Sequence, residues 1–321
     1  RRGHLVGGPY QRRPRRSGDR HGSLGQQVEA VVVDHVDRQD ARPGCQFAHV
    51  RGQVVEQQAT HTVHRPSIAP PAAACHTRPM LHIDDADRVR LLRIDRPEAL
   101  NALDEAHYDA LADALDEAAA SPDVAVVVLT GTGRAFCAGT DLGDMERRKD
   151  PDSGFVPGRH GFAGFMDRLS TFSKPVVVAV NGLGIGIGAT VIGHADLVFM
   201  STGARLQCPF TALGVVPEAA SSYLFPRLLN RQDATWVLLS SEWIDAEECL
   251  RMGLAWRLCA PEALMDEAMD HARRLAAKPV ASLVASKRLL TAPLAEAIAE
   301  ARVREDRLFA ELMGGPANAE A

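Results

Sequence analysis

The 321-residue chain contains no run of about 18 apolar residues, so its sequence predicts no membrane-spanning helix. It also lacks an excess of positive charge: 36 basic and 41 acidic residues give a formal net charge of −5, which argues against a general nucleic-acid-binding protein. Its six cysteines lack metal-site spacing and are too few for a disulfide scaffold, so we interpret them as reduced thiols of a cytoplasmic protein. With 46% hydrophobic residues, the chain can still build a folded core.

Residues 1–79 differ in composition from the rest of the chain. They hold 12 Arg, no Lys and 6 acidic residues, so their charge is 12 − 6 = +6, and the first methionine of the chain is Met80. Apolar residues are too sparse here to offset the entropy lost on ordering the segment. The segment is either a disordered basic arm or a mistranslated extension upstream of a true start at Met80. We favour the second interpretation and expect no function in these residues.

Beyond Met80 the chain alternates predicted strands and helices, as α/β proteins do. Apolar and β-branched runs predict strands at 89–94, 124–130, 175–180 and 197–201, and those at 124–130 and 175–180 are expected to be buried on both faces. An apolar face predicts a helix over 104–120, and helices predominate from about residue 219. Buried strands separated by helices favour parallel pairing. We assign the core to residues 80–270 and a C-terminal helical region to residues 271–321; the resemblance described below implies that this region is truncated at its end.

Two glycine-rich loops each follow a predicted buried strand. In the first, residues 131–145, an alanine–glycine pair allows a tight turn and leaves the N–H of Thr140 free. In the second, residues 181–190, closely spaced glycines permit a ligand to approach the start of a helix, where free N–H groups bind anions. Either loop alone could be an ordinary connection, and the glycine spacing does not fit a dinucleotide site. Together the loops could supply one N–H each to a single carbonyl oxygen, forming an oxyanion hole.

The motifs AFCAGTDL, KPVVVAVNGLGIGIGAT and HADLVFMS, in this order, resemble the crotonase family, also called the enoyl-CoA hydratase/isomerase superfamily. The resemblance covers roughly Met80 to Ala321. It implies a crotonase-like fold with a repeated ββα spiral core, and a C-terminal helical region that assembles a trimer or a dimer of trimers. It also implies an acyl-CoA thioester substrate, polarised by the backbone N–H groups of Thr140 and Ile187. No cofactor is implied, because coenzyme A is part of the substrate.

The catalytic acid distinguishes the members of this family. Hydratases carry two glutamates, but the matching positions here hold Thr190 and Phe210, and neither residue can activate water. Glu218, within CPFTALGVVPEAASSYLFP, matches the catalytic glutamate of peroxisomal-type Δ3,Δ2-enoyl-CoA isomerases. The resemblance therefore favours an isomerase of fatty-acid metabolism. A hydratase or other acyl-CoA reaction and an inactive CoA-binding protein remain alternatives. Considered alone, Glu218 could also be a helix-start carboxylate that interacts with the helix dipole.

By the same resemblance, CoA lies along residues 96–103 and the first glycine loop. The implied substrate-binding residues are Ala99, Ala138, Gly139, Asp141 and Gly186. Asp141 has a structural alternative, because an aspartate in a loop commonly accepts hydrogen bonds from nearby backbone N–H groups. Lys287 and Arg288 either meet the CoA phosphates or lie on a solvated helix face. The chain shows no spacing for a metal site, and we expect neither a nucleic-acid nor a membrane partner.

Overall fold

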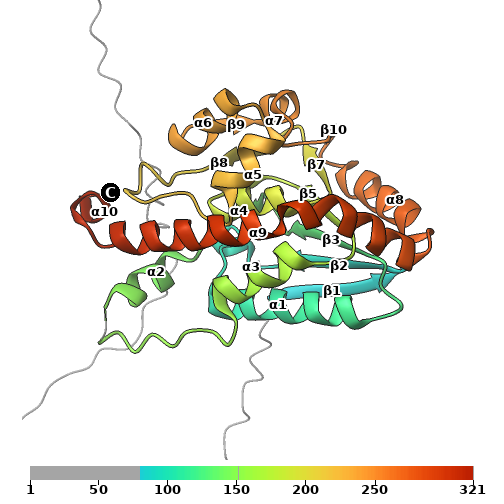
Figure 1. The fold of residues 1–321 in the computed structure, drawn as a ribbon, viewed down its shortest axis with the longest axis horizontal. Helices are drawn as coiled ribbons and strands as arrows, with labels where there is room; N and C mark the ends of the chain where they lie inside the picture. Colours follow the sequence, from blue (N-terminus) through green and yellow to red (C-terminus); the bar gives the residue numbers. More distant parts are fainter. Residues whose placement is uncertain (1–79, 151, 321) are drawn as a thin grey trace, which may run out of the picture. The chain divides into compact units, whose positions relative to one another are not determined.

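The computed structural model describes residues 80–150 and 152–320 (Figure 1). The predictions made for residues 1–79 lie outside the described residues. No helix in the described ranges is long and apolar enough to cross a membrane. Strands and helices alternate through the first half of the described chain and helices predominate after it, which confirms the predicted α/β class.

A six-stranded sheet in the order β1-β2-β3-β5-β7-β10 forms the centre of the fold. The four predicted strands are present as β2 (Val89–Ile94), β3 (Val126–Gly131), β5 (Val176–Val180) and β7 (Leu197–Ser201). They pair in parallel, as expected for strands joined by crossover connections. The two edge strands were not predicted. They are β1 (Leu81–Ala86), antiparallel to β2, and β10 (Arg257–Cys259), parallel to β7.

A second, four-stranded sheet has the order β4-β6-β8-β9 and was also missed by the sequence analysis. Its strands are β4 (Ala135–Cys137), β6 (Leu183–Ile185), β8 (Arg205–Gln207) and β9 (Trp243–Asp245). Strands β4, β6 and β8 each follow directly on a strand of the main sheet. The pairs β3–β4, β5–β6 and β7–β8 therefore each contribute one strand to each sheet. This alternation is the repeated two-strand arrangement predicted for the core. It also means that both glycine-rich loops contain a short strand.

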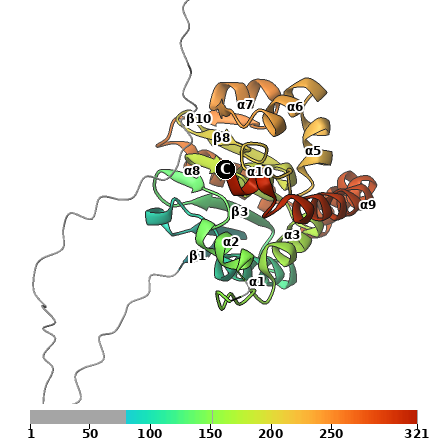
Figure 2. The ribbon, with the colours of Figure 1, turned by 90° about the vertical axis from the view of Figure 1, so that its left-hand side faces the viewer.

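Helices cover both faces of the main sheet. On one face α1 (Glu105–Ala120) packs with α3 (Gly161–Thr171), and Leu111 of α1 points into the core as predicted. On the other face α8 (Leu264–Ala276) lies across the parallel strands and packs through small residues such as Ala272. Figures 1 and 2 show α8 and α1 on opposite sides of β3. Every residue of β3 and β5 is buried because both faces are covered.

Seven further helices occur in the described residues, and one of them, α4, lies within the second glycine loop. They are α2 (Leu142–Lys149), α4 (Ile187–Thr190), α5 (Ser221–Leu228), α6 (Arg231–Leu239), α7 (Ala246–Met252), α9 (Val280–Leu312) and α10 (Pro316–Glu320). Short 3₁₀ turns occur at Pro97–Ala99 and Val191–His194. The predicted domain boundary at 270/271 falls inside α8. Helix α9 packs against α3 and α5, so the C-terminal region is in contact with the core of its own chain.

Candidate active site

The two glycine-rich loops lie directly against each other. Gly139 has a φ of +100°, and a Cβ at this position would lie 3.1 Å from the carbonyl oxygen of Ile185. Gly186 also has a positive φ, +56°, and the nearest atom to a Cβ there would be the Cα of Gly139. A Cβ on Gly188 would lie only 2.0 Å from the carbonyl oxygen of Cys137. The expectation that Gly184, Gly186 and Gly188 make room for a ligand is therefore wrong at Gly188, where the neighbouring strand fills the space. It is also wrong at Gly184, where a Cβ would lie 2.6 Å from the side chain of Leu206.

The two predicted donors, the N–H groups of Thr140 and Ile187, each follow one of the touching glycines. Leu103 and Thr140 form an isolated parallel β-bridge. The N–H of Leu103 donates to the carbonyl oxygen of Gly139, and the N–H of Asp141 donates to the carbonyl oxygen of Leu103, both at 2.8 Å. In this pattern the N–H of Thr140 itself points away from Leu103. Ile187 is the first residue of α4, so its N–H has no carbonyl partner within the helix. In the described part of the chain, neither N–H donates to a protein acceptor.

The segment 96–103 supports the first glycine loop. Asn101 is fully buried, and its side-chain amide donates to two carbonyl oxygens of that loop at 2.7 and 2.9 Å. The N–H of Ala138 donates to the carbonyl oxygen of Leu100 at 3.0 Å. Ala99 precedes Leu100, so the structure brings the predicted CoA-binding residues Ala99 and Ala138 into neighbouring loops. Whether they contact CoA remains a prediction.

Asp141 anchors the end of the first glycine loop. Its Oδ1 accepts the N–H of Asp144 at 3.2 Å and so caps α2, and its Oδ2 lies 2.7 Å from the guanidinium of Arg96. The bond from the N–H of Asp144 is the kind that the structural alternative for Asp141 predicted, and the ion pair with Arg96 was not predicted. They engage both carboxylate oxygens within the protein, and direct contact with a substrate stays a prediction.

Tyr108 lies behind Thr140 and was not singled out by the sequence analysis. Its hydroxyl is 2.7 Å from Oγ1 of Thr140, and its side chain is fully buried. Burial raises the pKa of Tyr108 well above its usual value, and the nearby charge of Glu218 acts in the same direction. The phenol therefore stays neutral and holds the Thr140 side chain in place. The available signal was its position among the apolar residues of the predicted helix 104–120.

Glu218 lies in the turn before α5, and its carboxylate reaches α4. The hydroxyl of Thr190 donates to Oε1 of Glu218 at 2.6 Å, so the acid is tied to the short helix that begins at Ile187. The pKa of Glu218 is raised to about 8: burial raises it most, the hydrogen bond from Thr190 lowers it, and the charges of Glu305 and Asp306 raise it. Part of the side chain remains accessible. Thr190, which stands where hydratases carry a glutamate, thus hydrogen-bonds to Glu218.

A different carboxylate caps α5. The N–H groups of Ala220 and Ser222 donate to Glu305 of α9 at 2.6 and 2.9 Å. The alternative interpretation of Glu218 as the helix-start carboxylate is therefore wrong, because Glu305 occupies that position. Glu305 was not identified from the sequence, since it lies in a different helix and belongs to no motif that we considered.

We expect Glu218→Gln to stabilise the fold increasingly as the pH rises. The carboxyl group titrates near 4.5 when unfolded and near 8 when folded, so its contribution to stability is full below pH 4.5 and declines up to pH 8. The glutamine variant escapes this loss, by about 2 kcal/mol above pH 8 once partial solvent access is allowed for. Denaturant unfolding between pH 5 and pH 9 measures the difference. The exposed Glu242→Gln serves as control, and a gain independent of pH would contradict the expectation.

The expectations for Lys287 are both wrong. Its ammonium group is buried and donates to Asp196 at 2.7 Å and to the carbonyl oxygen of Lys174 at 2.8 Å. It therefore links α9 to the residues that precede β5 and β7. It neither reaches outward to a phosphate nor lies on a solvated face. Arg288, the next residue, is exposed, as the solvated alternative predicted.

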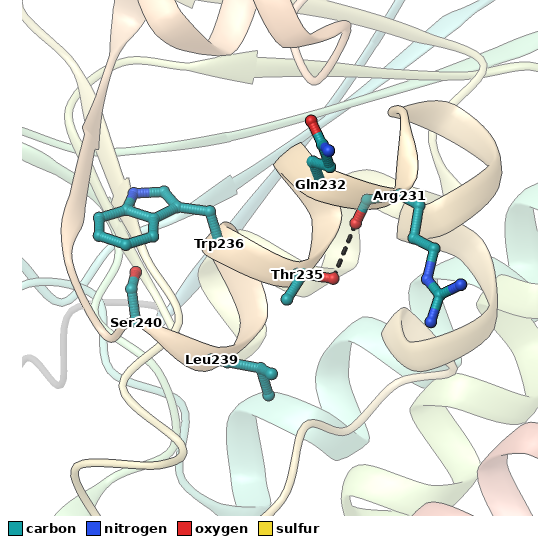
Figure 3. Close-up of a pocket in the computed structure, with 6 residues that line it drawn as sticks. All are labelled: Arg231, Gln232, Thr235, Trp236, Leu239 and Ser240. Atoms are coloured by element: carbon teal, nitrogen blue, oxygen red, sulfur yellow. Dashed lines mark hydrogen bonds between the residues drawn. The ribbon is translucent and has the colours of Figure 1, made fainter.

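The described residues also form a surface hollow of about 580 Å³ along α6 (Figure 3). Its lining consists of Arg231, Gln232, Thr235, Trp236, Leu239 and Ser240. None of these is a predicted site residue. Figure 3 shows five of these side chains along α6 and that of Ser240 just after it, with the hydroxyl of Thr235 hydrogen-bonded to the carbonyl oxygen of Arg231. We assign this hollow no catalytic role.

The fold, the paired glycine loops and the single acid beside them define an enzyme of the crotonase type. A family model described as enoyl-CoA hydratase/isomerase matches residues 85–315. The chain belongs to the enoyl-CoA hydratase/isomerase family, as the motifs predicted.

Individual relatives carry several names. The chain is 34% identical over 200 residues to the 1,2-epoxyphenylacetyl-CoA isomerase of Escherichia coli, covering 61% of this chain and 75% of the relative. A crystal structure of an enoyl-CoA hydratase from Mycobacterium marinum is 60% identical, with a TM-score of 0.64, covering 67% of this chain and all of that one. An enoyl-CoA hydratase/isomerase from Pseudoalteromonas atlantica is 36% identical with a TM-score of 0.72, covering 75% and 94%.

Proposed function

We propose that this protein is a Δ3,Δ2-enoyl-CoA isomerase that acts on acyl-CoA thioesters in the fatty-acid metabolism of the cytoplasm. The observation that carries the proposal is the state of Glu218. This residue is a desolvated carboxylate with a pKa of about 8, held by Thr190 against the helix that presents the N–H of Ile187. A base with a pKa near the working pH is suited to moving a proton to and from carbon.

In the proposed reaction Glu218 takes a proton from C2 of a 3-enoyl-CoA. The C2–H electron pair forms the C1–C2 double bond of a dienolate that keeps its C3–C4 double bond, while the π pair of the C1 carbonyl moves onto the thioester oxygen and places the negative charge there. The N–H groups of Thr140 and Ile187 stabilise that oxygen, each worth about 3–4 kcal/mol in the transition state. Glu218 then returns the proton to C4, where the C3–C4 π pair accepts it; the C1–C2 pair becomes the C2–C3 double bond, and the oxygen lone pair re-forms the thioester carbonyl. No group besides the substrate is consumed, so the proposal needs neither a metal nor a cofactor.

Hydration is the second candidate, because the Mycobacterium marinum relative is described as an enoyl-CoA hydratase. Adding water to a double bond calls for a base to activate water and an acid to protonate carbon. Here Thr190 is already bonded to Glu218, and Phe210 is a buried apolar side chain. A single carboxylate therefore suits isomerisation better than hydration.

The proposal keeps Ala99, Ala138, Gly139, Asp141 and Gly186 as the residues that border the CoA thioester. It also keeps assembly as a trimer or a dimer of trimers. Both follow from the family resemblance, and sedimentation of the purified chain tests the second.

Substrate specificity tests the function directly. The full chain is given a cis-3-enoyl-CoA or a trans-2-enoyl-CoA, and the absorbance of the conjugated thioester is followed. We expect conjugation to appear from the 3-enoyl substrate. Loss of conjugation from the 2-enoyl substrate at a comparable kcat/KM would instead establish a hydratase. Binding of both thioesters without turnover would contradict an enzymatic role.

A further inference from the structure

The turn that carries Glu218 has an unfavourable backbone. Ala219 and Ala220, the two residues that follow the acid, have φ values of +59° and +56°. Residues other than glycine rarely adopt this left-handed conformation, so two alanines in succession keep it only when their surroundings impose it. The direction in which Glu218 points therefore depends on the groups that hold this turn.

Three side chains hold the backbone of the turn, and one of them comes from far along the chain. The hydroxyl of Ser221 donates to the carbonyl oxygen of Glu218 at 2.6 Å, and the ring of His194 donates to that of Ala219 at 2.8 Å. Glu305 accepts the N–H groups of Ala220 and Ser222. It is 4% exposed, and both of its carboxylate oxygens are used in these two bonds.

Helix α9 is fixed firmly enough to act as a support. Ile298 and Ala301 are buried in the main core cluster. Arg302 donates to Asp167 at 2.6 Å and to the carbonyl oxygen of Ala163 at 3.1 Å, both on α3. The carboxylate of Glu305 is thus presented from a helix that packs on α3 and α5 at the same time.

We propose that Glu305 is the positioning residue for Glu218: it holds residues 218–222 in their strained conformation and keeps a negative charge beside the base. The inference rests on the proposed function for its kinetic consequences, although its structural part does not. Through Glu305, the packing of α9 therefore determines how Glu218 is oriented.

Several charged or titratable groups of the surrounding elements interact electrostatically with Glu218. They are Glu305, Asp306 and Arg302 on α9, Tyr108 on α1, Cys137 on β4 and Cys208 after β8. Among them, Glu305 combines a like charge with direct contact to the turn. Removing its charge should lower the pKa of Glu218, whereas a purely structural support would leave that pKa unchanged.

The test compares Glu305→Gln, Glu305→Asp and a control, Glu300→Gln. Glu300 lies on the same helix, is exposed and pairs with Arg304. For Glu305→Gln we expect kcat to fall about tenfold with KM nearly unchanged, because an amide cannot accept two N–H groups with a carboxylate's strength. The rise of kcat/KM with pH should move to lower pH. Glu305→Asp retains the charge and should restore the pH midpoint, and Glu300→Gln should match the unmodified protein.

A second measurement does not depend on turnover. The pH dependence of unfolding is compared between Glu218 and Glu218→Gln chains, with and without Glu305→Gln, which reports the pKa of Glu218 directly. A midpoint that moves down in the Glu305→Gln background supports the inference even if no isomerase activity is found. An unchanged midpoint, or a kcat equal to that of Glu300→Gln, would overturn it.

Discussion

Glu218→Gln is expected to lower kcat for isomerisation by about 10³-fold, within the range that removal of a general base produces. Glutamine fits the same volume and still accepts the hydroxyl of Thr190, which donates to Oε1 of the acid at 2.6 Å. The amide cannot take a proton from C2, so the loss falls on the chemical step and KM should remain close to that of the unmodified protein.

The pH profile supplies the internal check. In the unmodified protein kcat/KM should rise with pH as the carboxyl group ionises, with a midpoint near the pKa of about 8. The residual activity of Glu218→Gln should lack this titration. The exposed Glu242→Gln, made in parallel, should show the unmodified profile. A Glu218→Gln variant that kept a tenth of the activity would assign the proton transfer to another group.

The sequence was sufficient for the parts of this site that depend on local patterns. Buried strands such as β3 and β5 are apolar throughout, and a parallel sheet covered on both faces requires that pattern. Glu218 stood out because the segment around it, CPFTALGVVPEAASSYLFP, resembles the segment that carries the catalytic glutamate of the isomerases. Strands of three residues, such as β6 within the second glycine loop, carry too few residues to show a period of two and were read as turns.

Contacts between distant residues could not be predicted in the same way. Glu305 bonds to residues more than 80 positions earlier, and Lys287 to Asp196 across a similar separation. In the sequence both are charged residues of a helical segment, and such residues are usually solvated. Their burial depends on how α9 packs on the core, which neither helical periodicity nor a motif contains. The side chains that support the predicted acid were therefore missed, whereas the acid itself was found.

Gly188→Ala is expected to reduce activity by about 10²-fold or more, because it separates the two loops. The backbone of Gly188 is not in the left-handed region, so alanine suits its conformation and the obstacle is space alone. The added Cβ would lie 2.0 Å from the carbonyl oxygen of Cys137, and relieving that overlap requires α4 to move from β4 by about 1 Å. The N–H of Ile187 moves with it, away from the oxygen it would share with Thr140.

The matched control is Gly203→Ala. Gly203 is exposed, and an added Cβ would lie 4.0 Å from Oγ of Ser201. That variant should keep its activity and stability. Gly188→Ala should lose kcat and part of its thermal stability but retain the pH midpoint of Glu218, because Thr190 moves with α4 and the acid can follow. An unmodified kcat in Gly188→Ala would show that the close approach of α4 to β4 does not set the position of the Ile187 N–H. The proposed pairing of the N–H groups of Thr140 and Ile187 would then be wrong.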